Sequence, residues 1–390
     1  MAALRGSWPW ALALAVLALA GGLGAGFPAL VHMGYLLLGL LLLCLAYARL
    51  SLWTLDVEHR AAATRITLGE RLLEVYVART RAPWPIFNVD VVAHRGIAGV
   101  HASWDMALSP RGHGHEEWTA VSVGTTRGRY ALGVARIAVS DPFGLFVVRR
   151  WQRPTAEVIV HPRARIVPDF SLAVARAGDL LPARRSWAHM PVAGAVRPFA
   201  PGDASTRIHW LSSARHGLLM VKDSERSVGQ RLWVALDLSS PFHAGAGEES
   251  TVEYGVEAAA YVAALAFKAG LDVGLLVTGA GTLIAEPARG RDQREHLLDL
   301  LAMARDGMGP GFAATIAEQG TARPSDALVL LTPALPPDLL ELCVRLRRLG
   351  CGVAAVLLDA ASFGGVLVPP DAARLEAERI PIYTLGQGSL

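Results

Sequence analysis

The chain has 390 residues, which is enough for two or three domains with a substantial core. Hydrophobic residues make up 52% of it and charged residues 18%, a more apolar balance than a soluble enzyme needs. The formal net charge is only +3 and Lys and Arg form no run, so we expect no nucleic-acid partner.

Two uncharged stretches stand near the N-terminus, residues 8–27 (WPWALALAVLALAGGLGAGF) and residues 30–48 (LVHMGYLLLGLLLLCLAYA). Each has about the ~20 residues that cross a bilayer core. Only a short connection around Pro28 separates them. The pattern predicts a membrane hairpin of two transmembrane helices over residues 1–50, with the lipid bilayer as the first partner of the chain.

Basic residues flank this hairpin on both sides. Arg5 precedes it, and Arg49, Arg60 and Arg65 follow it. The positive-inside rule then predicts a multi-pass protein of the inner (plasma) membrane whose soluble domains are cytoplasmic. A cleaved signal peptide is the alternative, because Arg5, the apolar stretch and the small residues before Pro28 imitate its three regions. Even in that case the second stretch would act as a stop-transfer segment.

In the remainder of the chain, the pattern of apolar residues changes at two points. Residues 51–165 hold short alternating or apolar strands separated by Gly and Pro, which predicts an all-β, sandwich-like domain. Residues 166–229 form a connector. From residue 230 to 390, apolar strands alternate with helices expected near 252–269, 293–305 and 337–349. That alternation predicts an α/β domain with a parallel sheet of Rossmann type.

Neither nucleotide-binding fingerprint, GxGxxG or GxxxxGK, occurs in the α/β region, so we expect no nucleotide cofactor. The three cysteines, Cys44, Cys343 and Cys351, lie in apolar segments and lack the close paired spacing of a zinc site. Their number and placement do not make a disulfide framework either, which fits a reducing compartment.

The first strand of the α/β region ends in LDLSSPF, which places Asp237 and Ser239 where open α/β sheets bind ligands. This placement resembles the von Willebrand factor A-like domain, whose metal-ion-dependent adhesion site opens with Asp-x-Ser-x-Ser. Here Pro241 occupies the third position of that motif. Residues 309–311 stand where the family has a threonine, and Thr332 lies near the position of the family's further aspartate. We therefore expect a degenerate site without bound Mg²⁺, in which Asp237 and Ser239 cap the strand and the loop.

Two other patterns contain residue types that can carry chemistry. A Gly-punctuated loop carries His113, His115, Glu116 and Glu117, with His101 nearby, and is more typical of a solvated turn than of a metal site. No GxSxG elbow and no activated cysteine occurs. The nearest candidates for a nucleophile and its base are Ser212 or Ser213 with His209, but spacing shows no pocket or third group, so no residue is assigned as catalytic.

The segment from Arg197 to Asp223 (RPFAPGDASTRIHWLSSARHGLLMVKD) concentrates charged, aromatic and turn-forming residues. Asp203 follows a Pro-Gly turn and can pair with an arginine, and Arg207 offers a planar donor fork. Trp210 is a large amphipathic anchor. Such a mixture either fixes this segment to a neighbouring domain through a network of Asp203 and Arg207, or forms a recognition surface.

This segment resembles the signature of the "domain of unknown function 58" family, roughly Arg-x-Tyr-x-x-Gly-Asp-x-x-Arg-x-Ile-x-Trp-x-x-Ser-Ala-Arg followed by a Leu-x-Val-Lys/Arg strand. The matching positions are Arg197, Gly202, Asp203, Arg207, Ile208, Trp210, Ser213, Ala214, Arg215, Leu219, Val221 and Lys222, with Phe199 in place of the tyrosine. We expect the interaction residues to be Arg197, Gly202, Asp203, Arg207, His209, Trp210, Ser213, Arg215 and Lys222.

The resemblance continues in GTTRGRYALG, SDPFGLF and AEVIVHPR, and two N-terminal membrane helices are usual in the family. It implies a membrane-anchored, cytoplasm-facing interaction or scaffold protein that partners a MoxR-type AAA+ ATPase in protein assembly or maturation. One alternative is a membrane-bound hydrolase that uses Asp203, His209 and a serine. Another is a metal-dependent adhesion module.

Overall fold

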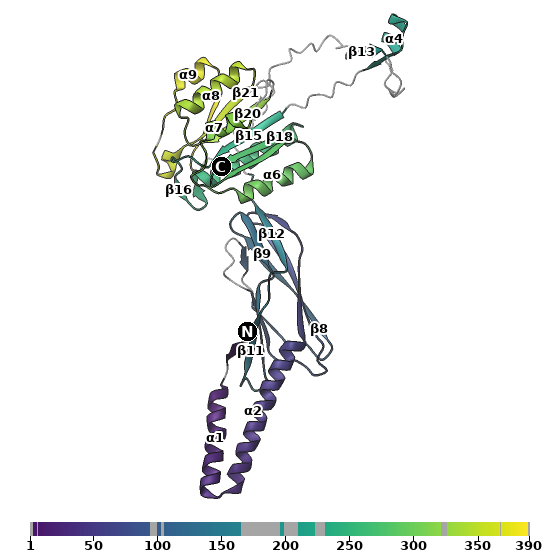
Figure 1. Cartoon of the computed structure of the whole chain (residues 1–390), viewed down its shortest axis with the longest axis vertical. Helices are drawn as coiled ribbons and strands as arrows, with labels where there is room; N and C mark the ends of the chain where they lie inside the picture. The colour runs from purple at the N-terminus through teal and green to yellow at the C-terminus, as the bar shows by residue number, and fades with distance from the viewer. Residues whose placement is uncertain are drawn as a thin grey trace. The chain divides into compact units, whose positions relative to one another are not determined.

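The structure is a computed structural model that describes residues 3–5, 7–93, 100–102, 105–164, 196–198, 210–222, 231–320, 326–366 and 368–388. The chain divides into two compact units, Met1–His161 and Pro162–Leu390. Figure 1 shows both units, with labels on part of their helices and strands.

Unit 1 begins with a hairpin of two helices, α1 (Trp8–Ala25) and α2 (Pro28–Thr54). Pro28 starts α2 without loss, because the first N–H of a helix has no partner within it. Gly26 ends α1 with a φ of +65°, a left-handed conformation that favours glycine. A Cβ on Gly22 would lie 2.7 Å from the Val31 nitrogen, so only a glycine allows the helices to approach this closely.

Both helices are long and apolar enough to cross a membrane, as the uncharged stretches predict. The second helix differs from the prediction at its end, because α2 continues past Ala48 to Thr54. Its last turns enter the core of the strands that follow, where Ala48 and Leu52 are buried. Packing against the strands therefore prolongs the helix beyond its apolar stretch.

The described strands of unit 1 form three sheets. The first has the order β1 (Ala3–Arg5), β11 (Val147–Trp151), β10 (Ala135–Ser140), β5 (Val89–Ala93) and β7 (Asp105–Leu108), and the second has β2 (Leu55–Ala61), β4 (Arg71–Thr80), β8 (His115–Gly124) and β6 (Val100–Ala102). A third joins β3 (Arg65–Thr67), β12 (Ala156–His161) and β9 (Gly128–Leu132).

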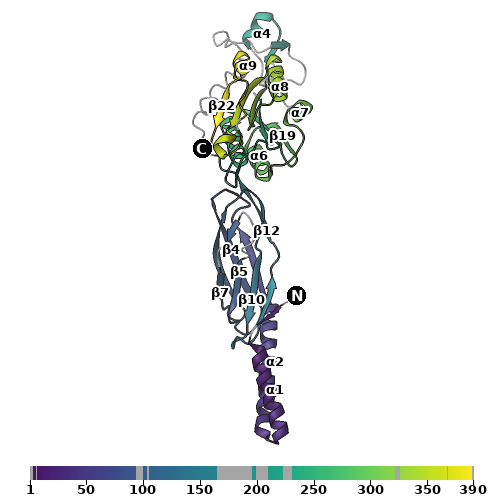
Figure 2. The same cartoon turned by 90° about the vertical axis from the view of Figure 1, so that its left-hand side faces the viewer.

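The first two sheets bury one shared core. Their inward residues, such as Tyr76 on β4, Ile137 on β10 and Val91 on β5, belong to a single hydrophobic cluster. Alternation along β4 and β8 produces this face, because successive side chains of a strand point to opposite sides. Figure 2 shows these strands running lengthwise from the ends of α1 and α2.

Unit 2 contains a six-stranded sheet in the order β19 (Thr282–Ala288), β18 (Asp272–Thr278), β15 (Arg231–Asp237), β20 (Ala327–Thr332), β21 (Gly352–Leu358) and β22 (Ile382–Leu385). All neighbours are parallel except β19, which pairs antiparallel with β18 at the edge. The predicted parallel sheet is therefore confirmed. Its central strands are buried along their whole length, as their apolar sequences require.

Helices cover both faces of this sheet (Figure 1). On one face lie α5 (Thr251–Lys268) and α6 (Arg291–Met303), and on the other α7 (Phe312–Glu318), α8 (Pro337–Arg348) and α9 (Ala372–Ala377). The three helices predicted from the sequence match α5, α6 and α8 within two residues. Shorter elements are β16 (Gly245–Ala246), β17 (Glu249–Ser250) and the 3₁₀ helix η2 (Ala360–Phe363).

The described parts of the segment before the sheet contain β13 (Val196–Pro198), α4 (Trp210–His216) and β14 (Met220–Lys222). The two strands pair antiparallel, with Arg197 opposite Val221.

Candidate functional site

The candidate site lies where three neighbouring strands of the parallel sheet end. Asp237, Thr278 and Thr332 are the last residues of β15, β18 and β20. From β15 the chain adds β18 and β19 on one side and then returns to place β20 on the other. The carboxyl ends of β15 and β20 therefore flank a topological switch point, the position at which open α/β sheets bind their ligands.

The Asp237 carboxylate is buried and accepts hydrogen bonds on both oxygens. Oδ1 accepts from the Ser239 backbone N–H at 3.0 Å, from the Ser239 hydroxyl at 2.9 Å and from the Thr278 hydroxyl at 3.3 Å. Oδ2 accepts from the Thr332 hydroxyl at 3.1 Å. Since Asp237 is 6% exposed and both threonines are fully buried, these contacts replace the water that the charge loses.

His243 ties the loop after β15 to the start of α5. Burial lowers the pKa of His243 below its ordinary value, although the backbone and charge of Asp237 and the charge of Asp306 oppose the shift. Its ring is therefore neutral at pH 7, and both nitrogens have partners that suit one tautomer. Nε2–H donates to the Asp237 carbonyl at 2.8 Å, and Nδ1 accepts from the Thr251 hydroxyl at 2.9 Å.

The helix start beside His243 is capped by a local sequence pattern. Ser250 precedes α5 and its hydroxyl accepts from the Glu253 backbone N–H at 3.3 Å. Ser followed three residues later by Glu is the capping-box sequence. The loop between β15 and α5 is thus held at its beginning by Asp237, in its middle by His243 and at its end by Ser250.

A cavity of about 360 Å³ opens beside this loop. Its lining includes His243, the backbone of Gly245–Gly247, Ser250, Glu253 and Asp306. Two of the lining residues are acidic and the imidazole is neutral, so the cavity favours a cationic group. A lysine or arginine side chain has suitable charge and size.

The loop that carries Asp306 is fixed by close backbone contacts. The Ala280 N–H donates to the Arg305 carbonyl at 3.0 Å, and the Gly307 N–H donates to the Leu238 carbonyl at 3.3 Å. A Cβ on Gly307 would lie 2.8 Å from the Ala280 Cα, and one on Gly279 would meet the Arg305 carbonyl oxygen. Glycine at these positions lets the loops at the carboxyl edge touch and gives Asp306 a defined place.

The residues at the switch point fit a divalent cation poorly. Hard cations such as Mg²⁺ need several oxygen ligands that are not otherwise engaged. Among the last residues of β15, β18 and β20, Asp237 supplies the one carboxylate, and Thr332 offers a hydroxyl near the place where the adhesion site has an aspartate. Thr315, which follows residues 309–311, donates instead to the Gly311 carbonyl at 3.0 Å within α7. Across the described part of the chain, no three His, Cys, Asp or Glu side chains form a metal-binding group.

Some of the predicted signature residues lie in the described segment before the sheet. Arg197 and Lys222 are on the paired strands β13 and β14. Trp210 begins α4 and is 69% exposed, and Arg215 is exposed on the same helix. Ser213 is partly buried, and its hydroxyl accepts from the Met220 backbone N–H at 2.9 Å. It therefore connects α4 to β14.

The other signature residues, Gly202, Asp203, Arg207 and His209, lie outside the described residues. The predicted network of Asp203 and Arg207 remains a prediction.

The two cysteines of unit 2 are buried and protonated. Burial raises the pKa of Cys343 to about 12 and that of Cys351 to about 11, the second with help from the charge of Asp326. Thiols of this kind are poor nucleophiles at neutral pH.

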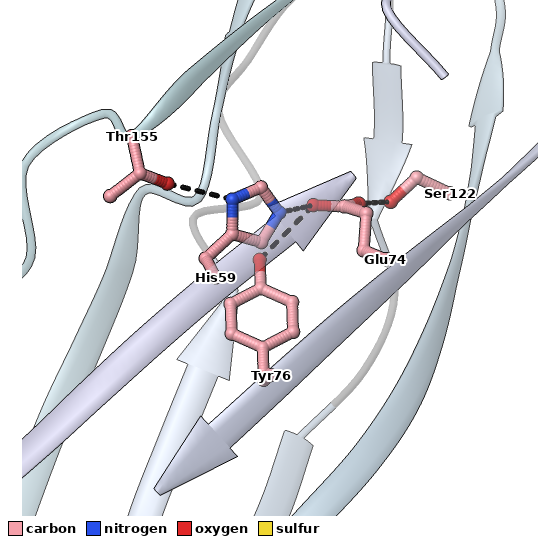
Figure 3. A network of polar contacts seen from close by, with 5 residues as sticks. All are labelled: His59, Glu74, Tyr76, Ser122 and Thr155. Carbon is pink, nitrogen blue, oxygen red and sulfur yellow. Dashed lines mark hydrogen bonds and ion pairs between the residues drawn. The ribbon is translucent and has the colours of Figure 1, made fainter. Parts of the chain in front are cut away.

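Sequence reasoning missed a buried polar network between the sheets of unit 1 (Figure 3). Glu74 Oε2 accepts from His59 Nε2 at 2.8 Å and from the Tyr76 hydroxyl at 3.1 Å, and the Ser122 hydroxyl donates to its other oxygen. His59 Nδ1 lies 2.7 Å from the Thr155 hydroxyl. The sequence signal that could have revealed this network was Glu74, a glutamate on the apolar face of an alternating strand.

This network is closed to solvent. Burial alone would raise the pKa of Glu74, but the hydrogen bonds from His59, Ser122 and Tyr76 and the His59 charge outweigh it and hold that pKa below its ordinary value. The side chains of His59 and Glu74 are 0% and 3% exposed, so no substrate reaches them. The network therefore stabilises unit 1 and is not a candidate active site.

Comparison with known proteins supports the signature resemblance over part of the chain. Residues 195–359 match the family described as "Protein of unknown function DUF58". The uncharacterized protein YeaD of Bacillus subtilis (strain 168) is 31% identical over 173 residues, which are 44% of this chain and 40% of that protein. The chain thus matches less than half of the length of this relative.

Solved structures show weaker similarity. Proximal thread matrix protein 1 from the mussel byssus is 14% identical, with a TM-score of 0.30 over 41% of this chain and 44% of that one. The RO (RSR) protein of Deinococcus radiodurans is 13% identical, with a TM-score of 0.26 over 56% of this chain and 50% of that one. Scores this low do not indicate a shared overall fold.

Proposed function

We propose that this chain is a membrane-anchored, cytoplasm-facing binding protein, and that its α/β unit holds a protein partner at the carboxyl edge of the sheet. The observation that carries the proposal is the cavity of about 360 Å³ beside the switch point, whose lining includes the acidic residues Glu253 and Asp306. A basic side chain of the partner enters this cavity and pairs with the two carboxylates.

The arrangement of the sheet supports a von Willebrand A-like identity for this unit. In order along the sheet, the strands are the third, second, first, fourth, fifth and sixth of unit 2's sheet, with the third antiparallel at the edge. Asp237 and Ser239 stand where such domains begin their adhesion site. In this chain Pro241 and Thr332 replace two of the oxygen ligands, so the partner is held by charge and shape and no metal ion is needed.

Anchoring follows from the apolar hairpin. The helices α1 and α2 have mean hydropathies of 1.6 and 2.3 over their most apolar windows and are largely exposed along their length. Exposed apolar surface of this extent favours lipid. Arg49 follows the second uncharged stretch within α2, and Arg60 lies on β2 after that helix, which supports a cytoplasmic location for both units.

The proposed partner is a MoxR-type AAA+ ATPase, and the proposed process is assembly or maturation of other proteins. The family resemblance of the signature supports this choice. Exposed Trp210 and Arg215 on α4 offer a second contact for the same partner, because Trp and Arg are enriched among residues that dominate binding.

The hydrolase alternative is less well supported. Ser213 is one of the two serines it would use, and the Ser213 hydroxyl already holds the Met220 N–H. The adhesion alternative would require Mg²⁺ to displace the hydroxyl groups that donate to Asp237.

A binding measurement tests the proposal. The full chain, reconstituted in lipid nanodiscs, is titrated with a purified MoxR-type ATPase, and Asp306→Asn is compared with Glu318→Gln, an exposed carboxylate on α7. Loss of one charge-assisted hydrogen bond of ~1.5–3 kcal/mol predicts at least a tenfold weaker Kd for Asp306→Asn and an unchanged Kd for the control.

Two results would contradict different parts of the proposal. Unchanged binding by Asp306→Asn and by Asp306→Asn with Glu253→Gln would remove the cavity as the docking site. Failure of the unsubstituted chain to bind any ATPase of this type would remove the proposed partner.

A further inference from the structure

The end of unit 1 that meets the two helices carries exposed aromatic and basic side chains on rigid turns. The first turn is residues 141–146, within the SDPFGLF element, and the second is residues 81–87 together with the loop 109–114 that packs on it. We call these segments the collar. We infer that the collar is a lipid-binding surface that seats unit 1 on an anionic bilayer; this inference rests on the proposed membrane anchoring.

The first turn is built to hold one phenylalanine outward. The Asp141 carboxylate is fully buried and accepts from the backbone N–H groups of Phe143 at 2.9 Å and of Phe146 at 2.6 Å. Gly144 has a φ of +69°, which lets the chain reverse. As a result Phe146 is buried while Phe143 is 67% exposed, a large apolar side chain with no packing to explain it.

This turn is attached to the first residue of α1. The Trp8 N–H donates to the Leu145 carbonyl at 3.1 Å, and the Trp8 and Phe146 rings stack with centroids 6.1 Å apart. Phe143 is therefore two residues from Leu145, whose carbonyl accepts from the first residue of the first apolar helix.

The second turn is attached to α2 in the same way. The Tyr47 hydroxyl donates to the Pro85 carbonyl at 2.7 Å and accepts from the Phe87 N–H at 3.2 Å. Phe87 is 43% exposed. The loop 109–114 joins this turn, because the Ile86 N–H donates to the Pro110 carbonyl at 3.0 Å. Figure 1 shows the strand ends of unit 1 beside the last turns of α2.

Helix length places these turns at the membrane boundary. At ~1.5 Å per residue, α1 measures about 27 Å, slightly less than the ~30 Å of hydrocarbon in a bilayer, so the core ends near Trp8. On α2, about 20 residues counted from Pro28 reach Tyr47. The two helices thus put the boundary at the residues to which the collar is hydrogen-bonded. Phe143 and Phe87 lie in the interfacial layer, where aromatic rings are favoured.

The charge of the collar suits anionic headgroups. Arg111, in the loop 109–114 of the collar, is exposed, and so is Arg49, which lies on α2 two residues after Tyr47. Neither makes an ion pair with a described residue, so each is available to a lipid phosphate. Anionic lipid near a membrane surface attracts such residues.

Depth measurements on the full chain test the inference. Phe143→Cys and Phe87→Cys are labelled with a fluorophore, which is selective because Cys44, Cys343 and Cys351 are buried. Leu17→Cys in the middle of α1 reports insertion of the hairpin, through quenching by a lipid that carries its nitroxide deep in the acyl chain. Thr125→Cys, exposed in the turn between β8 and β9 at the opposite end of unit 1, is the aqueous control.

In nanodiscs of phosphatidylcholine and phosphatidylglycerol, we expect a headgroup-level nitroxide lipid to quench labels 143 and 87 several-fold more than label 125. Aqueous iodide should show the reverse order. Exchange of Arg49 and Arg111 for Gln should remove the difference in quenching at 143 between this mixture and phosphatidylcholine alone, whereas Arg129→Gln at the opposite end should preserve it.

The possible failures are distinguishable. If lipid quenches label 17 but iodide reaches 143 and 87 as freely as 125, the hairpin is inserted and the collar does not touch the bilayer, which overturns the inference. If lipid does not quench label 17, the proposed anchoring itself is wrong and the inference falls with it. Retained dependence on anionic lipid in the double Gln variant would overturn the role of the two arginines.

Discussion

Replacement of Glu74 by Leu tests the buried network of unit 1. The substitution removes a carboxylate that is 2% exposed and leaves the donors of His59, Tyr76 and Ser122 without their acceptor. An unpaired buried polar group costs ~1–3 kcal/mol, and removal of one partner of a buried ion pair costs ~3–5 kcal/mol. We expect Glu74→Leu to lower the free energy of unfolding by about 3–5 kcal/mol.

Glu74→Gln should cost less, about 1–2 kcal/mol, because one acceptor oxygen remains while the new amide N–H₂ faces a donor. Glu58→Gln is the matched control. Glu58 lies on the neighbouring strand β2, and its pairs with Arg79 and Arg60 are exposed to solvent. Exposed pairs contribute at most ~1 kcal/mol.

Unfolding of the full chain in detergent, followed by near-ultraviolet circular dichroism, measures these values at several pH values. The pKa of Glu74 is depressed in the folded state, so its stabilisation is present above the ordinary value of 4.5 and is lost as pH falls below it. The difference between wild type and Glu74→Gln should therefore be constant from neutral pH down to about 5 and shrink at lower pH.

A double-mutant cycle with His59→Leu decides whether the groups act together. Residues in one network give coupling energies of ~0.5–3 kcal/mol. Loss of stability in the double variant equal to the sum of the single losses would refute the shared network. So would a Glu74→Leu variant that is as stable as the Glu58→Gln control.

Three further predictions concern the α/β unit. Gly279→Ala would drive a Cβ into a backbone carbonyl of the neighbouring loop and should cost ~2 kcal/mol or more, whereas Gly281→Ala has open space and should cost under ~1 kcal/mol, as thermal unfolding would show. Thr332→Val removes the hydroxyl that donates to Asp237 Oδ2 and should lower the free energy of unfolding by ~1–3 kcal/mol in denaturant titrations. Cys343, whose pKa burial raises to about 12, should react with a thiol reagent only in denaturant; fast labelling of the native chain would contradict its burial.

Local patterns in the sequence account for most of the secondary structure. The uncharged stretches predicted α1 and the first part of α2, and apolar strands alternating with amphipathic stretches predicted the parallel sheet and its helices. These features could be predicted because local hydrogen bonds and the periodic spacing of apolar residues involve residues that are close together in the chain. The end of α2 was misjudged because Arg49 ends the apolar stretch. The helix nevertheless continues to Thr54, because its last turns pack against the strands of unit 1.

The composition of the candidate site followed from the sequence only in part. Asp237 and Ser239 could be placed at a strand end, because the strand and the turn after it are local. Thr278 and the cavity residue Asp306 carried no local signal. They meet the loop after β15 because the strand order brings β18 beside β15 and close glycine contacts hold the loop of residue 306 against it.

By itself, the sequence determined that the chain has an apolar hairpin, a region of alternating strands and an α/β region, and it marked the end of β15 as a place for ligands. Only the tertiary structure decided that Glu74 has partners on β2, β4 and β8, that Asp237 accepts from three hydroxyl groups, and that Phe143 is exposed beside the start of α1. The physical reason is that periodicity and caps act over a few residues, whereas satisfaction of a buried charge depends on which distant segments are packed around it.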